Sequence, residues 1–569
     1  MGRAVLRQPD TEIPIARSRG IAPLRPPGGR GRDLGATAPG RVRWVPPQTT
    51  SDRPPSPFPL PPAGGGRGLN VLWVWGGFAL ALSLVAVPVF STLLPPLVDY
   101  PNHLARMHLL LEGGDAFYAV RWAALPNLAE DLIVPPLARL VPLDIAAKLF
   151  LVMIFALTAG GAIWLNRVVS SGWRLWPLLA FLFLYNRIFL WGFLNYLFGV
   201  GVALCGAASW LALEGKHLWL RILSSSVAAL ACYFCHIAAF GFYALVILGI
   251  EAEPAATELR ARRWPALGRR LLVAGAQFVV PVALLFGGSR VAEPATINYG
   301  AIWRKADLLF SVVDNYDRMF DITCFALFVG LIAGLAWARR LGLSRRLAWA
   351  TGIVFVIYML LPSQIWGGSG TDHRLPTALF LLLVAASTPR FPNRRVAVAV
   401  GVSAALMLVI RLGVIERVWR EADRVYSADL VGIDELPRGA KLAIAHPAGL
   451  LHVSAVPEVH LATLAVSRRE AFVPSLFAIP GQQPIALKRD FAELAAATQP
   501  QRLWQVLIDN HESVHSSLPA PLEHYDFVVL TDRRPFEMPS NRCLAPVFAR
   551  PTFQIFMIVH DLACPAPAD

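Results

Sequence analysis

The chain has 569 residues, of which 55% are hydrophobic and only 16% are charged, and its formal net charge is +14. This composition is too apolar and too sparsely charged for an ordinary soluble multidomain protein, and it predicts a membrane protein. The excess of arginine does not indicate a nucleic-acid-binding face, because it gathers in the N-terminal segment and in short loops between apolar runs. That distribution is typical of the cytoplasmic side of a polytopic membrane protein.

The N-terminal segment, residues 1–69, is rich in Arg, Pro and Gly and shows no apolar periodicity. We expect it to be a disordered cytoplasmic tail, with an over-extended gene start as the alternative interpretation. The apolar run that follows, residues 71–90, is long enough to cross a bilayer and lacks a small-residue cleavage site. It therefore favours a signal anchor with the N-terminus inside.

Further apolar runs predict an α-helical polytopic membrane domain over residues 70–412, with about eleven transmembrane helices and a first periplasmic loop over residues 95–144. The runs at 175–213 and 218–250 are too long for one span each, so we expect two helical hairpins with tips near Asn186-Arg187 and Cys235-His236. If both runs were single tilted helices, the count would be nine.

Four turns between predicted helices are rich in arginine and are therefore expected on the cytoplasmic side. They are residues 167–174, 260–270, 339–346 and 390–395. These turns alternate with loops predicted to lie outside, so everything after the eleventh helix is expected on the periplasmic side of a bacterial inner membrane.

The C-terminal segment, residues 413–569, has no run long enough to cross a membrane. Strand-like stretches at 441–445, 526–530 and 553–559 alternate with helical and Pro-rich pieces. We expect a small periplasmic α/β domain, joined to the last membrane helix by a charged helix over residues 416–429.

Four of the six cysteines lie in or beside apolar runs and are interpreted as buried thiols. Cys232 and Cys235 form a C-x-x-C pattern, but no βαβ pattern surrounds it, which favours buried thiols over redox or metal use. Cys543 and Cys564 lie in the C-terminal segment, where an oxidising compartment would allow them to form a disulfide.

Ionisable residues just beyond the helix ends on the predicted periplasmic side are candidates for function, because charges near a membrane are costly. The first cluster begins at Asp99, before a helix that would lie on the membrane surface with an apolar stripe of Leu104, Met107 and Leu111. Two interpretations of Asp99 stay open. It either caps this helix, or it is a general base that accepts a proton from an acceptor hydroxyl.

The second cluster, Asp372-His373-Arg374, precedes the tenth predicted helix. Arg374 either extends from the helix end toward water or binds a phosphate through its bidentate donors. Elsewhere, His236 is expected to be a packed or pore-facing histidine and not a ligand, and Asp314 and Asp317 are expected to lie in a solvated loop.

These features resemble the GT-C membrane glycosyltransferases, the class that includes protein O-mannosyltransferases and the aminoarabinose transferase. The resemblance lies in an acidic residue directly after the first helix, Asp99, followed by a surface helix. The stretch Asp372-His-Arg-Leu-Pro-Thr-Ala-Leu-Phe-Leu-Leu-Leu is similar to the Arg-Tyr-Leu-Leu-Pro stretch that opens a late helix in bacterial members. The order of helices followed by an exported C-terminal domain is similar as well.

The resemblance implies transfer of a sugar, usually with inversion, from a polyprenyl-phosphate donor in the bilayer to a glycan, lipid or protein acceptor at the periplasmic face. Asp99 would be the acceptor-activating base, assisted by His103 and Arg106. Arg374 would contact the donor phosphate, together with His373 and Asp372.

Many members of this class carry paired acids in the first loop, whereas Asp99 is followed by Tyr100. The next acids lie well downstream, at Glu112, Asp115, Glu130 and Asp131. No cofactor is assigned, no residue is assigned as a metal ligand, and a divalent metal ion stays open.

The alternative is a non-enzymatic polytopic membrane protein, either a transporter or an assembly factor for envelope polysaccharide. A transporter is expected to show inverted repeats and ionisable residues at mid-helix depth. The sequence shows neither pattern, which favours the glycosyltransferase.

Overall fold

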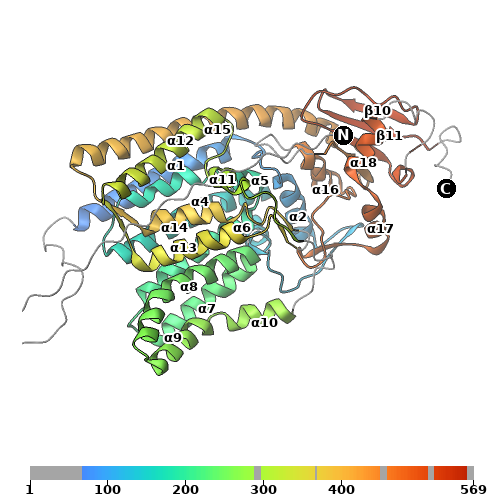
Figure 1. Cartoon of the computed structure of the whole chain (residues 1–569). Coiled ribbons are helices and arrows are strands. Elements are labelled where there is room, and N and C mark those ends of the chain that lie inside the picture. The colour runs from blue at the N-terminus through green and yellow to red at the C-terminus, as the bar shows by residue number, and fades with distance from the viewer. Residues whose placement is uncertain are drawn as a thin grey trace, which may run out of the picture. The chain divides into compact units, whose positions relative to one another are not determined.

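The computed structural model describes residues 67–287, 297–365, 368–448, 458–509, 518 and 520–560. The predicted N-terminal tail, residues 1–69, lies outside this part of the chain except for its last three residues, which begin the first helix. Within the described part, a set of long helices is followed by a C-terminal part that contains a β-sheet (Figure 1).

Each of the eleven predicted membrane segments is helical. They are α1 (Arg67–Ser91), α4 (Leu143–Ser170), the 3-10 helix η1 (Trp176–Phe183) with α5 (Arg187–Trp191), α6 (Leu194–Ala212), α7 (Leu218–Cys235), α8 (Ile237–Arg260), α9 (Trp264–Ala276) with α10 (Val279–Gly287), α12 (Arg318–Trp337), α13 (Arg345–Leu360), α14 (Leu375–Ala386) and α15 (Arg394–Asp434). Among the described residues, seven helices are long and apolar enough to cross a membrane, or eight if the bent pair α9 and α10 is one span. The chain is a polytopic α-helical membrane protein, as predicted.

The predicted number of eleven spans exceeds this seven or eight, because an apolar run does not show where its helix ends. The clearest case is α14, which has 12 residues. At ~1.5 Å of rise per residue it measures about 18 Å, against a hydrocarbon core of about 30 Å.

Both long apolar runs are interrupted at the predicted tips, so neither run is one continuous helix. Asn186 has an extended backbone between η1 and α5, and its Oδ1 accepts from the N–H of Phe189. His236 has φ −170° and ψ 140° between α7 and α8, and its Nδ1 accepts from the N–H of Ala238. Each side chain satisfies a backbone donor that the new helix leaves without a partner. His236 is a packed histidine, as expected.

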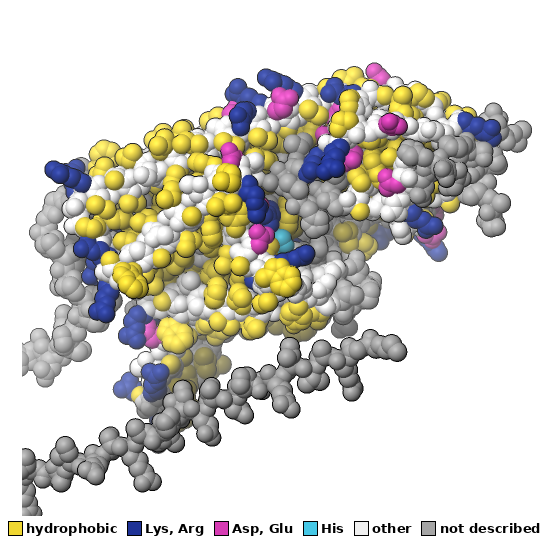
Figure 2. All heavy atoms as spheres, turned by 45° about the horizontal axis from the view of Figure 1, so that its top comes forward, with side chains coloured by type: hydrophobic (Ala, Val, Ile, Leu, Met, Phe, Trp, Pro, Cys, Tyr) yellow, Lys and Arg dark blue, Asp and Glu magenta, His cyan; other side chains and the backbone are white. Residues whose placement is uncertain are grey.

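Three of the four arginine-rich turns gather at one end of the helices. β3 (Leu341–Leu343) pairs antiparallel with β6 (Ser387–Pro389), which joins the turn before α13 to the turn before α15. Glu214, just after α6, forms ion pairs with Arg270 of α9 and with Arg346 of α13. Figure 2 shows Lys and Arg side chains at one end of a broad hydrophobic surface. The assignment of this end to the cytoplasm stays a prediction.

Helices α8 and α13 approach closely at Gly249, where a Cβ atom would lie 2.2 Å from the Cα of Ala350. We expect Gly249→Ala to lower the free energy of unfolding by about 1 to 3 kcal/mol, because the added methyl must push two packed helices apart. The matched control is Gly241→Ala on the same helix, where a Cβ would meet nothing within 4 Å. Thermal unfolding in detergent checks the pair, and equal melting temperatures for the two variants would contradict this packing.

A buried ion pair joins α12 to α15, and the sequence analysis did not anticipate it. Arg411 Nη1 lies 2.5 Å from Asp321 Oδ1, and Nη2 of the same guanidinium donates to the carbonyl of Tyr185 at 2.8 Å. The other oxygen of Asp321 accepts from the N–H of Asn315 at 2.7 Å. Both charges are thus paired and hydrogen-bonded, as charges inside a membrane protein must be.

The C-terminal part is α/β, as predicted. Its four-stranded sheet has the order β10-β11-β9-β7, with β7 parallel to β9 and the other pairs antiparallel. The strands are β7 (Leu442–Ala445), β9 (Phe527–Thr531), β10 (Leu544–Ala549) and β11 (Phe553–Ile558), and the α-helices described after β7 are α16 (Leu464–Arg469), α17 (Arg489–Ala497) and α18 (Pro500–Trp504). The three strand-like stretches of the sequence correspond to β7, β9 and β11, whereas β10 was not predicted.

The 41-residue helix α15 connects the membrane helices to this sheet without a break (Figure 1). The charged helix expected at residues 416–429 is its second half. The boundary drawn at residue 413 therefore falls inside one continuous helix.

The first loop after α1 joins the C-terminal part directly. β1 (Tyr118–Val120) pairs antiparallel with β8 (Ile485–Leu487). The hydroxyl of Tyr118 donates to the carbonyl of Val473 at 2.7 Å and accepts from its N–H at 2.9 Å. These contacts hold the loop that carries Asp99 against a segment more than 350 residues later in the chain.

The cysteines of the C-x-x-C pattern, Cys232 and Cys235, are free and buried in α7, in agreement with the interpretation as packed thiols. Cys543 is buried directly before β10. Its predicted partner Cys564 lies outside the described residues, so the disulfide stays a prediction.

Candidate functional site

The helix that follows Asp99, α2 (Tyr100–Glu112), is buried on all sides near its start. Every residue from Tyr100 to Met107 is buried, although its sequence pattern predicted an apolar stripe lying on a membrane surface. That prediction was wrong, because α2 packs between α3 (Ala129–Ala138) and the C-terminal elements α16 and η3 (Glu458–Thr463). Asp99 therefore stands at the junction of the first loop and the C-terminal part.

Asp99 occupies the N-cap position of α2, but its side chain makes no capping hydrogen bond. This geometry contradicts the interpretation as a helix cap. The nearest cationic or titratable nitrogen is Nε2 of His460 in η3, 3.6 Å from Asp99 Oδ1. Burial raises the pKa of Asp99 to about 7, and Glu130 also raises it, while His103 and Arg106 lower it. A carboxyl group with such a pKa is suited to proton transfer near neutral pH.

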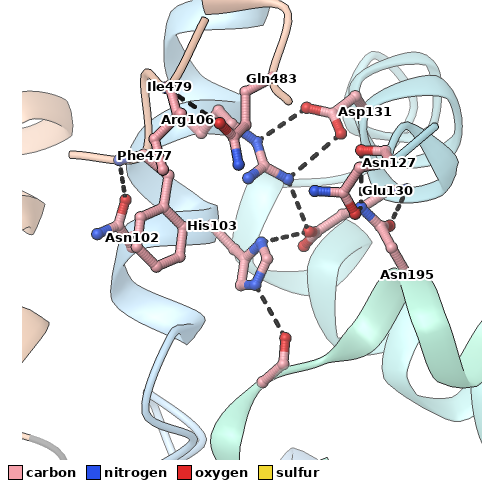
Figure 3. A network of polar contacts seen from close by, with 11 residues as sticks. Asn102, His103, Arg106, Asn127, Glu130, Asp131, Asn195, Phe477, Ile479 and Gln483 are labelled. Atoms are coloured by element: carbon pink, nitrogen blue, oxygen red, sulfur yellow. Dashed lines mark hydrogen bonds and ion pairs between the residues drawn. The ribbon is translucent and has the colours of Figure 1, made fainter. Parts of the chain in front are cut away.

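His103 and Arg106, predicted to assist Asp99, are buried in a network with two acids of α3 (Figure 3). His103 Nδ1 lies 2.6 Å from Glu130 Oε2, and Arg106 Nη2 lies 3.3 Å from the same oxygen. Arg106 Nε donates to Asp131 Oδ1 at 2.8 Å. The network joins α2 to α3 by ion pairs that water does not reach.

The ion pair with Glu130 favours the charged form of the histidine in this network. Burial lowers the pKa of His103, but the charge of Glu130 and its hydrogen bond raise it more, so that it lies above its usual value. Burial likewise raises the pKa of Glu130, and the cations His103 and Arg106 bring it below its usual value. The backbone N–H of Glu130 donates to Oδ1 of Asn195 at 2.7 Å, which ties the network to α6.

The second predicted cluster lies in the loop before α14. The ring of His373 packs against the ring of Trp191 with centroids 4.9 Å apart, and the guanidinium of Arg374 lies 4.7 Å from the ring centroid of Phe193. Burial lowers the pKa of His373 to about 4, although Asp372 raises it, and the cations Arg187, Arg374 and Lys305 lower it further. His373 is therefore neutral at neutral pH, in a region of positive charge.

Asp372 is buried and forms an ion pair with Lys305, whose Nζ lies 2.7 Å from Asp372 Oδ2. The ammonium also donates to the carbonyl of Leu361 at 2.6 Å. The position of Asp372 as a counter-ion to a buried lysine explains why a carboxylate lies in an otherwise cationic cluster.

Trp191 and Gly192 bring the two predicted clusters together. The N–H of Asp99 donates to the carbonyl of Trp191 at 3.2 Å, while the ring of Trp191 packs on His373. Gly192 has φ +93°, and a Cβ atom there would lie 2.7 Å from the Cβ of Asp99. His103 Nε2 lies 3.1 Å from the carbonyl of Gly192, so the ionic network also contacts this unit. Only glycine fits this position.

The third cluster was predicted to be a solvated loop, and for Asp314 this was wrong. Asp314 is buried and forms an ion pair with Arg187, at the start of α5. Asp317 instead caps α12, where its Oδ1 accepts from the N–H of Phe320 at 3.0 Å. The pair of Arg187 and Asp314 places a further guanidinium near His373.

Three functional candidates in the structure were missed by the sequence analysis: Glu130, Asp131 and His460. The two acids were noted as lying far downstream of Asp99, and the paired acids Glu130-Asp131 at the start of a helix were the available signal. His460 had none, because it is a lone histidine that reaches Asp99 from a segment 361 residues later. In the described part of the chain, no group of three or more His, Cys, Asp or Glu residues is arranged to hold a metal ion.

No family model matches the sequence, and no curated protein matches it. Among solved structures, the chain is similar to ArnT from Cupriavidus metallidurans, in a crystal structure bound to undecaprenyl phosphate. The TM-score is 0.48 and the identity 14%, with 87% of this chain and 99% of that chain covered.

Proposed function

We propose that the chain is a GT-C-like membrane glycosyltransferase, which moves a sugar from a polyprenyl-phosphate donor to an acceptor at the periplasmic face of a bacterial inner membrane. The observation that carries this proposal is the contact of Asp99 and of His373 with the same two-residue unit, Trp191-Gly192. This shared contact supports the proposal, in which Asp99 is the proton acceptor and the cationic cluster around Arg374 binds the phosphate.

Asp99 is the general base of the proposed reaction. It takes the proton of the acceptor hydroxyl as the acceptor oxygen forms its bond to the anomeric carbon of the sugar. The bond between that carbon and the phosphate oxygen breaks, and the polyprenyl phosphate leaves with the bonding electron pair. Because the pKa of Asp99 is raised to about 7, its ionised form is both present at neutral pH and basic enough to accept a proton.

The departing phosphate gains negative charge, and positive groups aimed at that charge lower the barrier. Arg374 supplies a planar guanidinium with paired donors, which match two phosphate oxygens. His373, neutral in this site, supplies an N–H donor. Lys305 and Arg187 add positive charge near His373. Each of them also keeps its own counter-ion, which is Asp372 for Lys305 and Asp314 for Arg187.

His103, Arg106 and Asp372 act on other residues rather than on the substrate in this proposal. His103 and Arg106 fix α2, and with it Asp99, through Glu130 and Asp131. Asp372 fixes Lys305. The partners are the bilayer, the lipid-linked sugar and an acceptor hydroxyl on a glycan, lipid or protein.

The proposal is tested with the purified full chain in detergent and a panel of polyprenyl-phosphate donors carrying radiolabelled sugars. We expect label transfer or release from at least one donor, and we expect Arg374→Gln to raise the donor KM by about tenfold or more, because a charge-assisted pair contributes roughly 1.5 to 3 kcal/mol. Arg345→Gln is the matched control, because the side chain of Arg345 is 83% exposed at the first residue of α13. The proposed phosphate site lies near the other end of this helix, where Lys305 contacts Leu361. An unchanged donor KM in Arg374→Gln would contradict the assignment of the phosphate site.

A further inference from the structure

The amide of Asn102, one turn into α2, has a fixed orientation. Its Oδ1 accepts from the backbone N–H of Phe477 at 2.7 Å, and its Nδ2 donates to the carbonyl of Ser475 at 2.9 Å. A rotated amide would place oxygen against oxygen and N–H against N–H. The two backbone partners therefore determine which side of the Asn102 amide carries the donors.

The orientation of Asn102 in turn determines the tautomer of His460. Nδ2 of Asn102 lies 3.4 Å from Nδ1 of His460, and because that amide nitrogen only donates, Nδ1 must be the acceptor. In a neutral imidazole the proton is then on Nε2. This nitrogen is the one that lies 3.6 Å from Asp99 Oδ1.

The surroundings of His460 keep the imidazole neutral. Burial lowers its pKa to about 3, and the nearby His446 and His103 lower it as well. Phe477 packs edge-to-face against His460 on one side and His103 on the other, with ring centroids 5.4 Å and 6.1 Å away. The ring is thus held between Asn102, Phe477 and Asp99 as a neutral donor.

We propose that His460 is a positioning residue for Asp99, which donates its Nε2–H to the carboxylate and holds the ionised side chain ready for the acceptor. This inference rests on the proposed function, in which Asp99 is the base. The separation of 3.6 Å is slightly longer than a hydrogen bond, and such contacts tighten when substrate is bound. The contacts from Asn102 to His460 and from His460 to Asp99 form only when the C-terminal part packs on α2.

The ionisation of Asp99 also depends on the other charged groups around it. His103 and Arg106 of α2 favour the ionised carboxylate, and Glu130 of α3 opposes it. His460 of η3 adds a donor to the ionised form, so its removal should raise the pKa of Asp99.

The test is the pH profile of sugar transfer by the full chain. In His460→Leu we expect the midpoint on the acidic side of the pH–rate profile to rise by about one pH unit. At pH values below this midpoint the rate should then be about tenfold lower than that of wild type. In His460→Gln, whose amide can still donate, we expect the midpoint to stay near that of wild type. His524→Leu is the matched control, because the side chain of His524 is 63% exposed in the same part of the chain.

A second readout separates this inference from the proposed function. Carbodiimide reacts with protonated carboxyl groups, so the pH at which Asp99 becomes half-labelled, followed by mass spectrometry, reports its ionisation without any turnover. If no donor is turned over but the labelling midpoint rises in His460→Leu, the proposed function fails and the contact with His460 stands. An unchanged midpoint in folded His460→Leu, or an equal rise in His460→Gln, would overturn the inference.

Discussion

Asp99→Asn is expected to lower the turnover of sugar transfer by about 10²- to 10⁴-fold, the usual contribution of a general base. The amide has the same shape as the carboxyl group but accepts no proton, and the side chain makes no capping hydrogen bond whose loss would unfold α2. The donor KM should change little, because the phosphate site lies with His373 and Arg374. Steady-state kinetics with a saturating acceptor measure both values.

Glu112→Gln is the control for this substitution, because Glu112 is exposed at the other end of the same helix.

The pH dependence of the rate gives a second check on Asp99. Because the pKa of Asp99 is raised to about 7, the basic form is lost as the pH falls through that value, and the wild-type rate should fall with it. The residual rate of Asp99→Asn should not show this fall at low pH. A full rate in Asp99→Asn would exclude Asp99 as the base.

Glu130→Gln is expected to lower the free energy of unfolding by about 3 to 5 kcal/mol, because it leaves the buried His103 without its carboxylate partner and removes one of the two carboxylate partners of Arg106. Glu130 Oε2 contacts both His103 and Arg106, and all three side chains are more than nine-tenths buried. Glu421→Gln, which removes an exposed partner of Arg424, should change stability by less than about 0.5 kcal/mol. Denaturation in detergent compares the two variants, and similar unfolding midpoints would contradict a structural role for the network.

The same network predicts how stability depends on pH. The pKa of His103 is raised in the folded protein, so its contribution is complete below the usual value of 6.5 and is lost as the pH rises through the folded pKa. The pKa of Glu130 is lowered, so its contribution is present above the usual value of 4.5 and is lost as the pH falls through the folded pKa. The melting temperature of the wild type should therefore fall on the alkaline side of pH 6.5, and Glu130→Gln should show a smaller fall.

The membrane helices could be predicted from the sequence because apolar length and arginine-rich turns are local signals. The breaks at Asn186 and His236 followed from the length of two apolar runs, and each residue supplies a side-chain acceptor at the start of the next helix. The lengths of the short helices could not be predicted, since α14 ends after 12 residues where β6 pairs with β3, and the uniform hydrophobicity of α14 does not reveal this end.

The candidate site could be predicted only where its residues lie next to one another in the sequence. Asp99 and Arg374 were found from their places beside helix ends. Glu130 reaches His103 and Arg106 through the packing of α2 against α3, and His460 reaches Asp99 through the packing of α2 against the C-terminal part. No local pattern encodes those contacts. For the same reason the burial of α2 was missed, because the segment that covers it lies more than 350 residues away.

The most direct test of the proposed function is product analysis by mass spectrometry, with the folded wild-type chain in liposomes that contain a polyprenyl-phosphate-linked sugar and a mixture of envelope acceptors. We predict that the donor loses the mass of its sugar, that free polyprenyl phosphate appears, and that the same sugar mass appears on an acceptor. Donors that stay intact across the panel, with a folded protein present, would contradict the glycosyltransferase assignment and favour a non-enzymatic transporter or assembly factor.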